Sequence, residues 1–547
     1  MFKDIFKRQI NSITVAAALV ALSSLASRLL GVVRDRILAG EFGAGTTLDI
    51  YYAAFRIPDL VYNLIVLGAL SAGFIPIFTS LIKDYKCVKA KDCNGQENNN
   101  EAWSLANNIL NILLFGLVVL SLIGIIFAPA LTRLIAPGFS ADEQALTAAL
   151  TRVMFMSPLF LGISGIIGGI LQSFKRFLVY SLAPVLYNIG IIIGAIYFVP
   201  IWGIYGLAWG VILGAFLHMA IQLPTVYQLG FRYSLRINWR DADTWKMGRM
   251  MVPRTLSLAV SQINLVVITV LASNLSAGSL TVFNLANNLQ SFPIGIFGVS
   301  FAIAAFPSLA EAAFNKEKLS ISFSSTMRQI LFFVIPATFL IIALRAQIIR
   351  VVLGTGNFDW QDTILTMNTL GFFAVSLFAQ ATIPLLVRVF YARHNSSLPF
   401  YLGLASVGVN VILSIFLAPR FGVAGLALAF SIASILNFLL LWIFLYLRVG
   451  ILDIGNIFKA VLKFTISSIA AGGAAQIMKV IVWPYIDMAK FSGVFIQLLA
   501  AGGFGLLVYL FFCYLFKSEE LFGLVASLKH RWPFNKVKID DQLSAND

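Results

Sequence analysis

The sequence predicts an all-α integral membrane protein with about fourteen transmembrane helices, arranged as two parallel-repeat six-helix lobes followed by a C-terminal helix pair. Composition is the first reason. Hydrophobic residues make up 59% of the 547 positions and charged residues only 12%, with a mean hydropathy of +0.89. Soluble domains are far more polar. The second reason is a series of apolar runs, each long enough to cross the ~30 Å of hydrocarbon in a bilayer.

The apolar runs follow one another from the first residues almost to the last. We expect helices near 12–38, 48–82, 104–135, 145–174, 178–199, 204–229, 243–274, 279–313, 322–353, 363–392, 397–418, 423–447, 457–482 and 491–516. The start MFKDIFKRQ has the basic character of a signal peptide. The segment after it is too long and contains Arg28, so we expect an uncleaved first helix.

The basic excess of the chain follows the predicted helices. Formal net charge is +15, and alternating fourteen helices from a cytoplasmic N-terminus puts most of the 39 Lys and Arg residues on the cytoplasmic side. That bias is the positive-inside rule. It predicts a multi-pass membrane protein with both termini in the cytoplasm, and it argues against a surface for nucleic acid.

An internal repeat supports the two lobes. PIWGIYGLA at 200–208 returns as PRFGVAGLA at 419–427, an offset of 219 residues. Because six helices separate the copies, both copies share one orientation, and repeats of this kind place a substrate path at their interface. We therefore expect lobes at 1–230 and 231–450, with helices 13 and 14 and a cytoplasmic tail at 451–547.

Charged and amide side chains lie inside several apolar segments, where one arginine costs at least ~2.5–3.5 kcal/mol. They recur at steps of three, four or seven residues, which places them on helical stripes. The stripe residues are Arg28 and Asp35; Asp49, Arg56 and Asn63; Arg254, Ser257, Ser261 and Asn264; and Asn284 and Asn288. Matching helices of the two copies carry them, which predicts a cationic central cavity for an anionic substrate. Alternatively, the Ser and Asn side chains are only hydrogen-bonding contacts between helices.

Several stretches resemble one family. SRLLGVVRDRILAGEFGAGTTLDIYYAAFRIP, followed by GALSAGFIPIF, is similar to the opening of the MurJ (MviN) lipid II flippases of the multidrug/oligosaccharidyl-lipid/polysaccharide exporter superfamily. The resemblance implies a transporter, not an enzyme, that moves the undecaprenyl-diphosphate-linked peptidoglycan precursor to the outer leaflet by alternating access. It also implies a groove between helices 13 and 14 for the lipid tail. Family positions with functional roles match Ser27, Arg28, Arg34, Asp35 and Asp49.

The chain departs from the family pattern at some cavity positions. Tyr62 stands where relatives carry an arginine, and Asn288 stands where they often carry another. We expect Arg56 and Arg254 to replace these cations. On a straight helix Arg34 points roughly 120° away from Arg28, toward the outer interface unless the helix bends.

Other chemistry has little support in the sequence. GEFGAGTT at 40–47 lacks the lysine of a phosphate loop, and Cys87 and Cys93 have no further ligands nearby for a metal. The three histidines are scattered, and we assign them no role.

We expect no cofactor, with the membrane potential or an ion gradient as energy source. We also expect a monomer whose partners are the lipid-linked diphosphate and membrane lipids. The alternatives are an exporter of another polyprenyl-linked precursor or of a drug, and a polyprenyl-diphosphate-dependent transferase, which the short outer loops disfavour.

Overall fold

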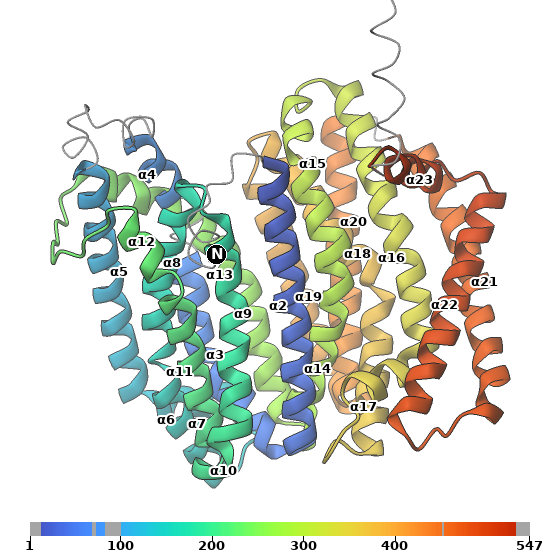
Figure 1. The fold of residues 1–547 in the computed structure, drawn as a ribbon, viewed down its shortest axis with the longest axis horizontal. Coiled ribbons are helices and arrows are strands. Elements are labelled where there is room, and N and C mark those ends of the chain that lie inside the picture. The colour runs from blue at the N-terminus through green and yellow to red at the C-terminus, as the bar shows by residue number, and fades with distance from the viewer. Residues whose placement is uncertain (1–12, 68–72, 83–99, 451–452, 532–547) are drawn as a thin grey trace, which may run out of the picture. The chain divides into compact units, whose positions relative to one another are not determined.

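The computed structural model describes residues 13–67, 73–82, 100–450 and 453–531. Within these ranges every regular element is a helix (Figure 1), so the all-α prediction is confirmed there. The predicted loop with Cys87 and Cys93 lies outside them. The chain divides into two compact units: Met1–Leu289 with Val352–Thr369 and Gly403–Phe430, and Gln290–Val351 with Leu370–Leu402 and Ser431–Asp547. The predicted division at 230 and 450 comes from the repeat and stays a prediction.

All fourteen apolar segments contain helix. In chain order the main helices are α2 (Ile13–Phe42), α3 (Thr46–Tyr62), α4 (Ile75–Leu81), α5 (Asn100–Ile126), α6 (Ala128–Ile135), α7 (Ala141–Met154), α8 (Ser157–Ser173), α9 (Phe177–Ile193), α10 (Val199–Trp202), α11 (Tyr205–Ala220), α12 (Leu223–Gln228), α13 (Ala242–Ser273), α14 (Ser279–Pro293), α15 (Ser300–Glu311), α16 (Lys316–Val352), α17 (Trp360–Val375), α18 (Leu377–Ala392), α19 (Ser397–Phe421), α20 (Val423–Val449), α21 (Ile454–Val482), α22 (Phe491–Leu515) and α23 (Glu519–Arg531).

Ten helices in the described ranges are long and apolar enough to cross a membrane, or eleven if the bent pair α17 and α18 is one span. The chain is therefore a multi-pass membrane protein, and the full count of fourteen stays a prediction. Helices α2, α3 and α13 are not among the ten. These three helices carry most of the predicted polar stripes. Their charged and amide side chains lower their hydropathy below that of an ordinary membrane-spanning helix.

The repeat has the same turn in both copies. Gly203 and Gly422 adopt φ of +57° and +58°, a left-handed conformation that side chains rarely tolerate. Three residues later, a Cβ on Gly206 would lie 2.4 Å from the Phe198 carbonyl carbon, and one on Gly425 would lie 2.3 Å from the Leu417 oxygen. Each glycine thus lets one helix approach the backbone of the helix before it, which explains why the motif occurs twice.

A polar ladder fixes the segment that precedes α13. Residues 231–238 run extended along α5, and three asparagines of α5 bond to their backbone: Asn107 to Arg232 and Ser234, Asn111 to Ser234 and Arg236, and Asn108 to Asn238. These asparagines are 3–4% exposed. Buried amides satisfied by backbone groups hold a segment in one register.

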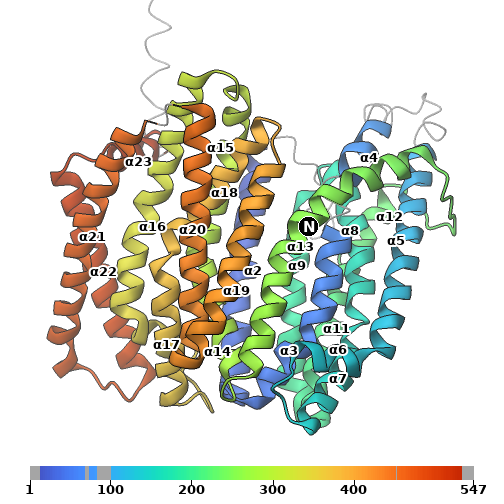
Figure 2. The same cartoon turned by 180° about the vertical axis from the view of Figure 1, so that it is seen from behind.

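In the second unit, α21 and α22 run side by side (Figure 2). A Cβ on Gly505 of α22 would lie 3.0 Å from the Ala471 oxygen of α21, so the two backbones are close. Tyr509 of α22 donates a hydrogen bond of 2.7 Å to the Phe332 carbonyl of α16. The helix pair is therefore anchored to α16 through a buried aromatic core.

Candidate functional site

A polar cavity of about 390 Å³ lies within the first unit. Six helices contribute its walls, namely α2, α3, α8, α9, α11 and the part of α14 up to Leu289. The lining residues are Arg34, Leu38, Tyr51, Tyr52, Phe55, Arg56, Pro58, Asp59, Tyr62, Ser157, Leu161, Pro184, Tyr187, Ile191, His218, Asn284 and Asn288. Four predicted site residues are thus brought together: Arg34, Arg56, Asn284 and Asn288.

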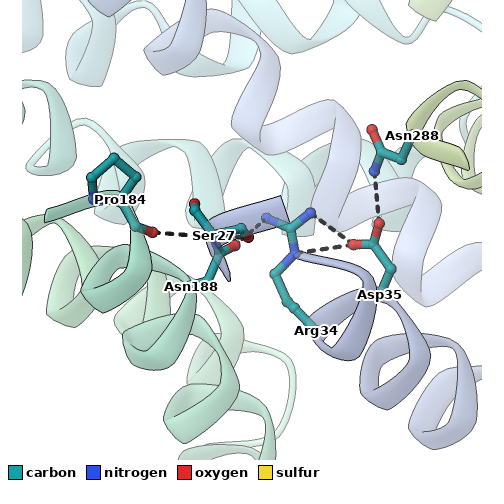
Figure 3. Close-up of polar contacts among 6 residues, drawn as sticks. All are labelled: Ser27, Arg34, Asp35, Pro184, Asn188 and Asn288. Atoms are coloured by element: carbon teal, nitrogen blue, oxygen red, sulfur yellow. Dashed lines mark hydrogen bonds and ion pairs between the residues drawn. The ribbon is translucent and has the colours of Figure 1, made fainter. Parts of the chain in front are cut away.

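Arg34 holds the centre of a hydrogen-bonded network (Figure 3). Its Nε and Nη2 donate to one oxygen of Asp35, at 3.0 and 2.7 Å, and its Nη1 donates to Oδ1 of Asn188 at 3.1 Å. The other oxygen of Asp35 accepts from Nδ2 of Asn288 at 2.8 Å. Arg34 therefore lines the cavity, as expected for a site residue, and it does not take the alternative direction toward the outer interface. The neighbouring carboxylate and Asn188 together draw the flexible side chain inward.

Arg56 is buried, with 8% of its surface exposed. Its Nε donates to Oγ1 of Thr269 at 3.0 Å and its Nη2 donates to Oδ1 of Asn284 at 3.2 Å. Both hydrogen-bond partners are neutral. The carboxylate of Asp59 lines the same cavity and attracts the guanidinium without a hydrogen bond that would occupy its donors. A buried cation is costly unless a nearby anion or a ligand compensates it.

Tyrosines form much of the remaining wall. Tyr51, Tyr52, Tyr62 and Tyr187 all line the cavity. The hydroxyl of Tyr52 is buried and has no hydrogen-bond partner among the described residues. Buried hydroxyls normally have one, so this group is available to a ligand. The cavity can therefore offer two guanidinium groups, amides and a phenol to an anionic, hydroxyl-rich molecule.

Asp49 does not line the cavity. Its carboxylate, 3% exposed, accepts from the backbone N of Gly278 and of Thr281, both at 2.7 Å, and from the Thr281 hydroxyl at 2.6 Å. These donors are at the start of α14, where free amides and the helix dipole favour a negative charge. Asp49 thus ties the beginning of α3 to the beginning of α14.

The turn after α2 makes further contacts at the same helix ends. The amide of Ala44 donates to Asp362 at 2.9 Å, and the amide of Asn357 donates to the Gly40 carbonyl at 2.8 Å. A Cβ on Gly278 would lie 1.8 Å from the Ala44 oxygen. The glycine-rich run at 40–47 therefore has a packing role, since its backbone is in direct contact with three other segments.

The other predicted residues have varied surroundings. Ser27 accepts a hydrogen bond from Asn188 at 3.3 Å, and Asn264 accepts one from Asn410 at 2.7 Å. Asn63 and Ser261 donate to carbonyls of their own helices, at 2.9 and 2.8 Å. Arg28 is half-buried on α2 and does not line the cavity. The side chains of Arg254 and Ser257 lie outside the described residues, so their roles stay predictions.

Several cavity residues were missed from the sequence. Tyr51 and Phe55, four residues apart on α3, looked like ordinary apolar packing, and Asp59 was left out of the predicted site. Tyr62 was expected at a cavity position in place of a family arginine, and it lines the cavity. Asn188 occurs in the stretch SLAPVLYNI, where Ser181, two turns earlier, is too weak a polar signal to mark a stripe. It could have been recognised only from its position opposite α2.

His218 was also assigned no role, and it lines the cavity from the last turn of α11. Its Nδ1 is 2.6 Å from Oγ of Ser164 on α8. Its ring meets Tyr187 of α9 edge-on, with the centroids 6.5 Å apart. No cluster of three His, Cys, Asp or Glu side chains that could hold a metal occurs in the described part of the chain.

Comparisons with known proteins agree with this architecture. A protein from Buchnera aphidicola subsp. Acyrthosiphon pisum, named probable lipid II flippase MurJ, is 30% identical over 435 residues, which cover 78% of this chain and 83% of that protein. A solved structure of lipid II flippase MurJ in an inward closed conformation aligns with a TM-score of 0.74 at 25% identity, covering 91% of this chain and 98% of that one. An inward-facing multidrug resistance transporter of the MATE family has the same fold, with a TM-score of 0.63 at 16% identity over 80% of this chain and 99% of that one.

A family model gives a further match. The model described as lipid II flippase MurJ covers residues 38–500, which include five of the six cavity helices and the end of α2. The chain therefore belongs to the lipid II flippase MurJ family, whose members are membrane transporters rather than enzymes.

Proposed function

We propose that this protein flips lipid II, the undecaprenyl-diphosphate-linked peptidoglycan precursor, across the bacterial inner membrane. The observation that carries the proposal is the cavity of the first unit, in which Arg34 and Arg56 line one polar space. Family membership supplies the substrate, and the cavity supplies a place for its head group.

The diphosphate is the part of the substrate that needs these arginines. Each guanidinium presents several N–H donors in a planar fork that matches phosphate oxygens, and hydrogen bonds to charged groups are about twice as strong as neutral ones. Among the described residues, the hydrogen-bond partners of Arg56 are the neutral Thr269 and Asn284, with Asp59 as the nearby carboxylate. A diphosphate would replace these weak contacts with charge-assisted ones. Arg34, already paired with Asp35, would orient the substrate and add less net affinity.

An apolar groove in the second unit suits the polyprenyl tail. Its volume is about 540 Å³, and α16, α18, α20 and α21 line it with side chains such as Leu331, Phe339, Phe438, Trp442 and Val461. The part of α21 that lines the groove, Ile454 to Thr465, precedes Ala471, where the backbone of α21 meets Gly505 of α22. The tail is therefore better placed between α16 and α21 than between helices 13 and 14, where Gly505 and Ala471 leave no room.

Alternating access would open and close one end of the first unit. The contacts of Asp49 with α14 and of Asp362 with Ala44 hold that end together. With both termini in the cytoplasm, this is the outer end, and its opening would release the head group. π-Helical segments at Asn63–Leu67 and Ile294–Val299, in the second helix of each predicted repeat, are candidates for the bending that such a change requires.

Energy would come from the membrane potential or an ion gradient, and the protein would act as a monomer. The potential alone favours outward movement of an anionic head group, because moving one charge through 100 mV is worth about 2.3 kcal/mol. No bound cofactor is needed for this cycle.

Complementation tests the proposal. The protein is expressed in a bacterium from which its own lipid II flippase can be depleted, and growth and cell shape are followed. We expect rescue by the wild type and loss of rescue by the double variant Arg34→Ala, Arg56→Ala at an equal membrane level. If the wild type reaches the membrane and lipid II still accumulates in the inner leaflet, another polyprenyl-linked precursor or a drug is the substrate.

A further inference from the structure

We propose that His218 is a proton-binding residue of the cavity and takes up a proton when the anionic head group binds. This inference rests on the proposed function, because it concerns the same cavity. The protein side of the cavity would carry one more positive charge with the head group bound than when empty. The inference also gives a role to a histidine to which the sequence analysis assigned none.

The first support is position. His218 lines the cavity, and its Nδ1 is 2.6 Å from the Ser164 hydroxyl. The described residues offer no hydrogen-bond partner to its Nε2, the other ring nitrogen. The ring is held by Ser164 on one edge and by the edge-on contact with Tyr187. It is therefore fixed in place, with one nitrogen left for a ligand.

The second support is the bonding capacity of Ser164. Its Oγ is within reach of Nδ1 and also 3.2 Å from the His218 carbonyl oxygen, and it accepts from Nε2 of Gln222 at 2.5 Å. With a neutral imidazole, the hydroxyl proton is donated to Nδ1 and the ring proton is on Nε2. With an imidazolium, Nδ1–H donates to Oγ and the hydroxyl proton turns to the carbonyl.

Both arrangements satisfy every donor around Ser164. A serine hydroxyl rotates freely and has one donor and two acceptor sites. Gln222 keeps its hydrogen bond to Oγ in either state. The ring can thus gain a proton from solvent without breaking its support, which distinguishes this site from a histidine locked in one tautomer by a backbone amide.

Charges around the ring determine when the proton is bound. The charged and titratable groups of the cavity are Arg34 on α2, Arg56, Asp59, Tyr51, Tyr52 and Tyr62 on α3, and Tyr187 on α9, while α8 contributes only uncharged Ser157 and Ser164. Arg34 is paired with Asp35, and Arg56 shares the cavity with Asp59, so the empty cavity has no net charge, and burial disfavours a charged ring. A diphosphate makes the cavity negative and favours the imidazolium.

Protons bound together with the substrate can be counted. Purified protein in detergent is titrated with lipid II by calorimetry, at one pH and ionic strength, in phosphate and in Tris buffer, whose ionisation enthalpies differ. The difference in binding heat gives the number of protons taken up. We expect up to one proton for the wild type and little or none for His218→Gln. His394→Gln serves as the matched control, since His394 is in the second unit and should behave as wild type.

A second measurement needs no variant. Lipid II affinity of the wild type should fall as pH rises, by no more than about tenfold per pH unit for one proton. Ser164→Ala should reduce the uptake by removing the support of the imidazolium without removing the ring.

The possible results separate the inference from the proposed function. If the wild type binds lipid II with no proton uptake, or if His218→Gln takes up as many protons as the wild type, the inference falls and the function stands. The same holds if Asp59→Asn alone abolishes the uptake. If the wild type does not bind lipid II, the proposed function fails.

Discussion

Arg56→Ala should weaken lipid II binding while leaving the fold intact. The side chain has two hydrogen-bond partners, and each has another bond: Thr269 Oγ1 donates to the Leu265 carbonyl at 2.9 Å, and Asn284 Nδ2 donates to the Leu280 carbonyl at 2.7 Å. Removing the guanidinium therefore leaves neither partner without a hydrogen bond. The desolvation cost of the buried cation and its attraction to Asp59 act in opposite directions, so the melting temperature should change little.

The loss in affinity follows from the lost contact with the diphosphate. A hydrogen bond to a charged group contributes about 1.5–3 kcal/mol, and 1.4 kcal/mol corresponds to about tenfold in Kd. We expect a Kd for lipid II that is about 10- to 100-fold higher. Arg56→Lys should recover only part of the affinity, because an ammonium group lacks the planar fork.

The assay is direct titration of detergent-purified variants with lipid II, accompanied by thermal unfolding. Arg152→Ala is the matched control, since Arg152 is also helical but exposed, and donates to the Ile125 carbonyl at 3.2 Å. Equal lipid II affinity for wild type and Arg56→Ala would refute the assignment. So would a large fall in melting temperature, which would make Arg56 a structural residue.

Three further predictions concern other parts of the chain. Cys87 should react with a membrane-impermeant thiol reagent only after cells are permeabilised, because the Lys and Arg bias places its loop in the cytoplasm; labelling in intact cells would reverse the topology. Gly422→Ala should lower the melting temperature, at a cost of about 1–2 kcal/mol for a side chain at φ +58°, whereas Gly403→Ala, in open space within α19, should not. Arg328 lowers the pKa of Glu519 through a hydrogen bond of 2.7 Å. The attachment of α23 to α16 should therefore hold above the ordinary pKa of Glu and weaken as pH falls through the lowered value, seen as faster hydrogen exchange in α23; an exchange rate independent of pH in wild type, after correction for intrinsic exchange, would contradict this.

Helical periodicity predicted which face of a helix some cavity residues occupy. Arg56, Asn284 and Asn288 were predicted from stripes at 3.6 residues per turn and line the cavity of the first unit, and their role in binding a substrate stays a prediction. The repeat was predicted equally well, since its glycine turn requires the same residue in both copies. The local sequence is sufficient to predict a feature, such as a helix face or a glycine turn, that the backbone conformation alone determines.

Longer side chains and long-range partners were not predictable in the same way. Arg34 reaches the cavity because Asp35 and Asn188 draw it there, and Asn188 is 154 positions away in the sequence. Asp49 shares a stripe with Arg56, but its carboxylate accepts hydrogen bonds from the amides at the start of α14 and does not line the cavity. Periodicity does not reveal that a carboxylate on a polar stripe is already bonded to donors of another helix.

The asparagine ladder on α5 has a mechanical consequence. It joins residues 231–238 to α5 along their length, and it ends at Thr244, whose hydroxyl accepts from Asn108 at 2.9 Å within the first turn of α13. A connecting segment bonded in this way cannot act as a flexible linker. When α13 moves, α5 must move with it or several hydrogen bonds must break together. The movements of the two helices are therefore coupled. A single residue inserted into 231–238 would shift every later hydrogen bond of this segment out of register.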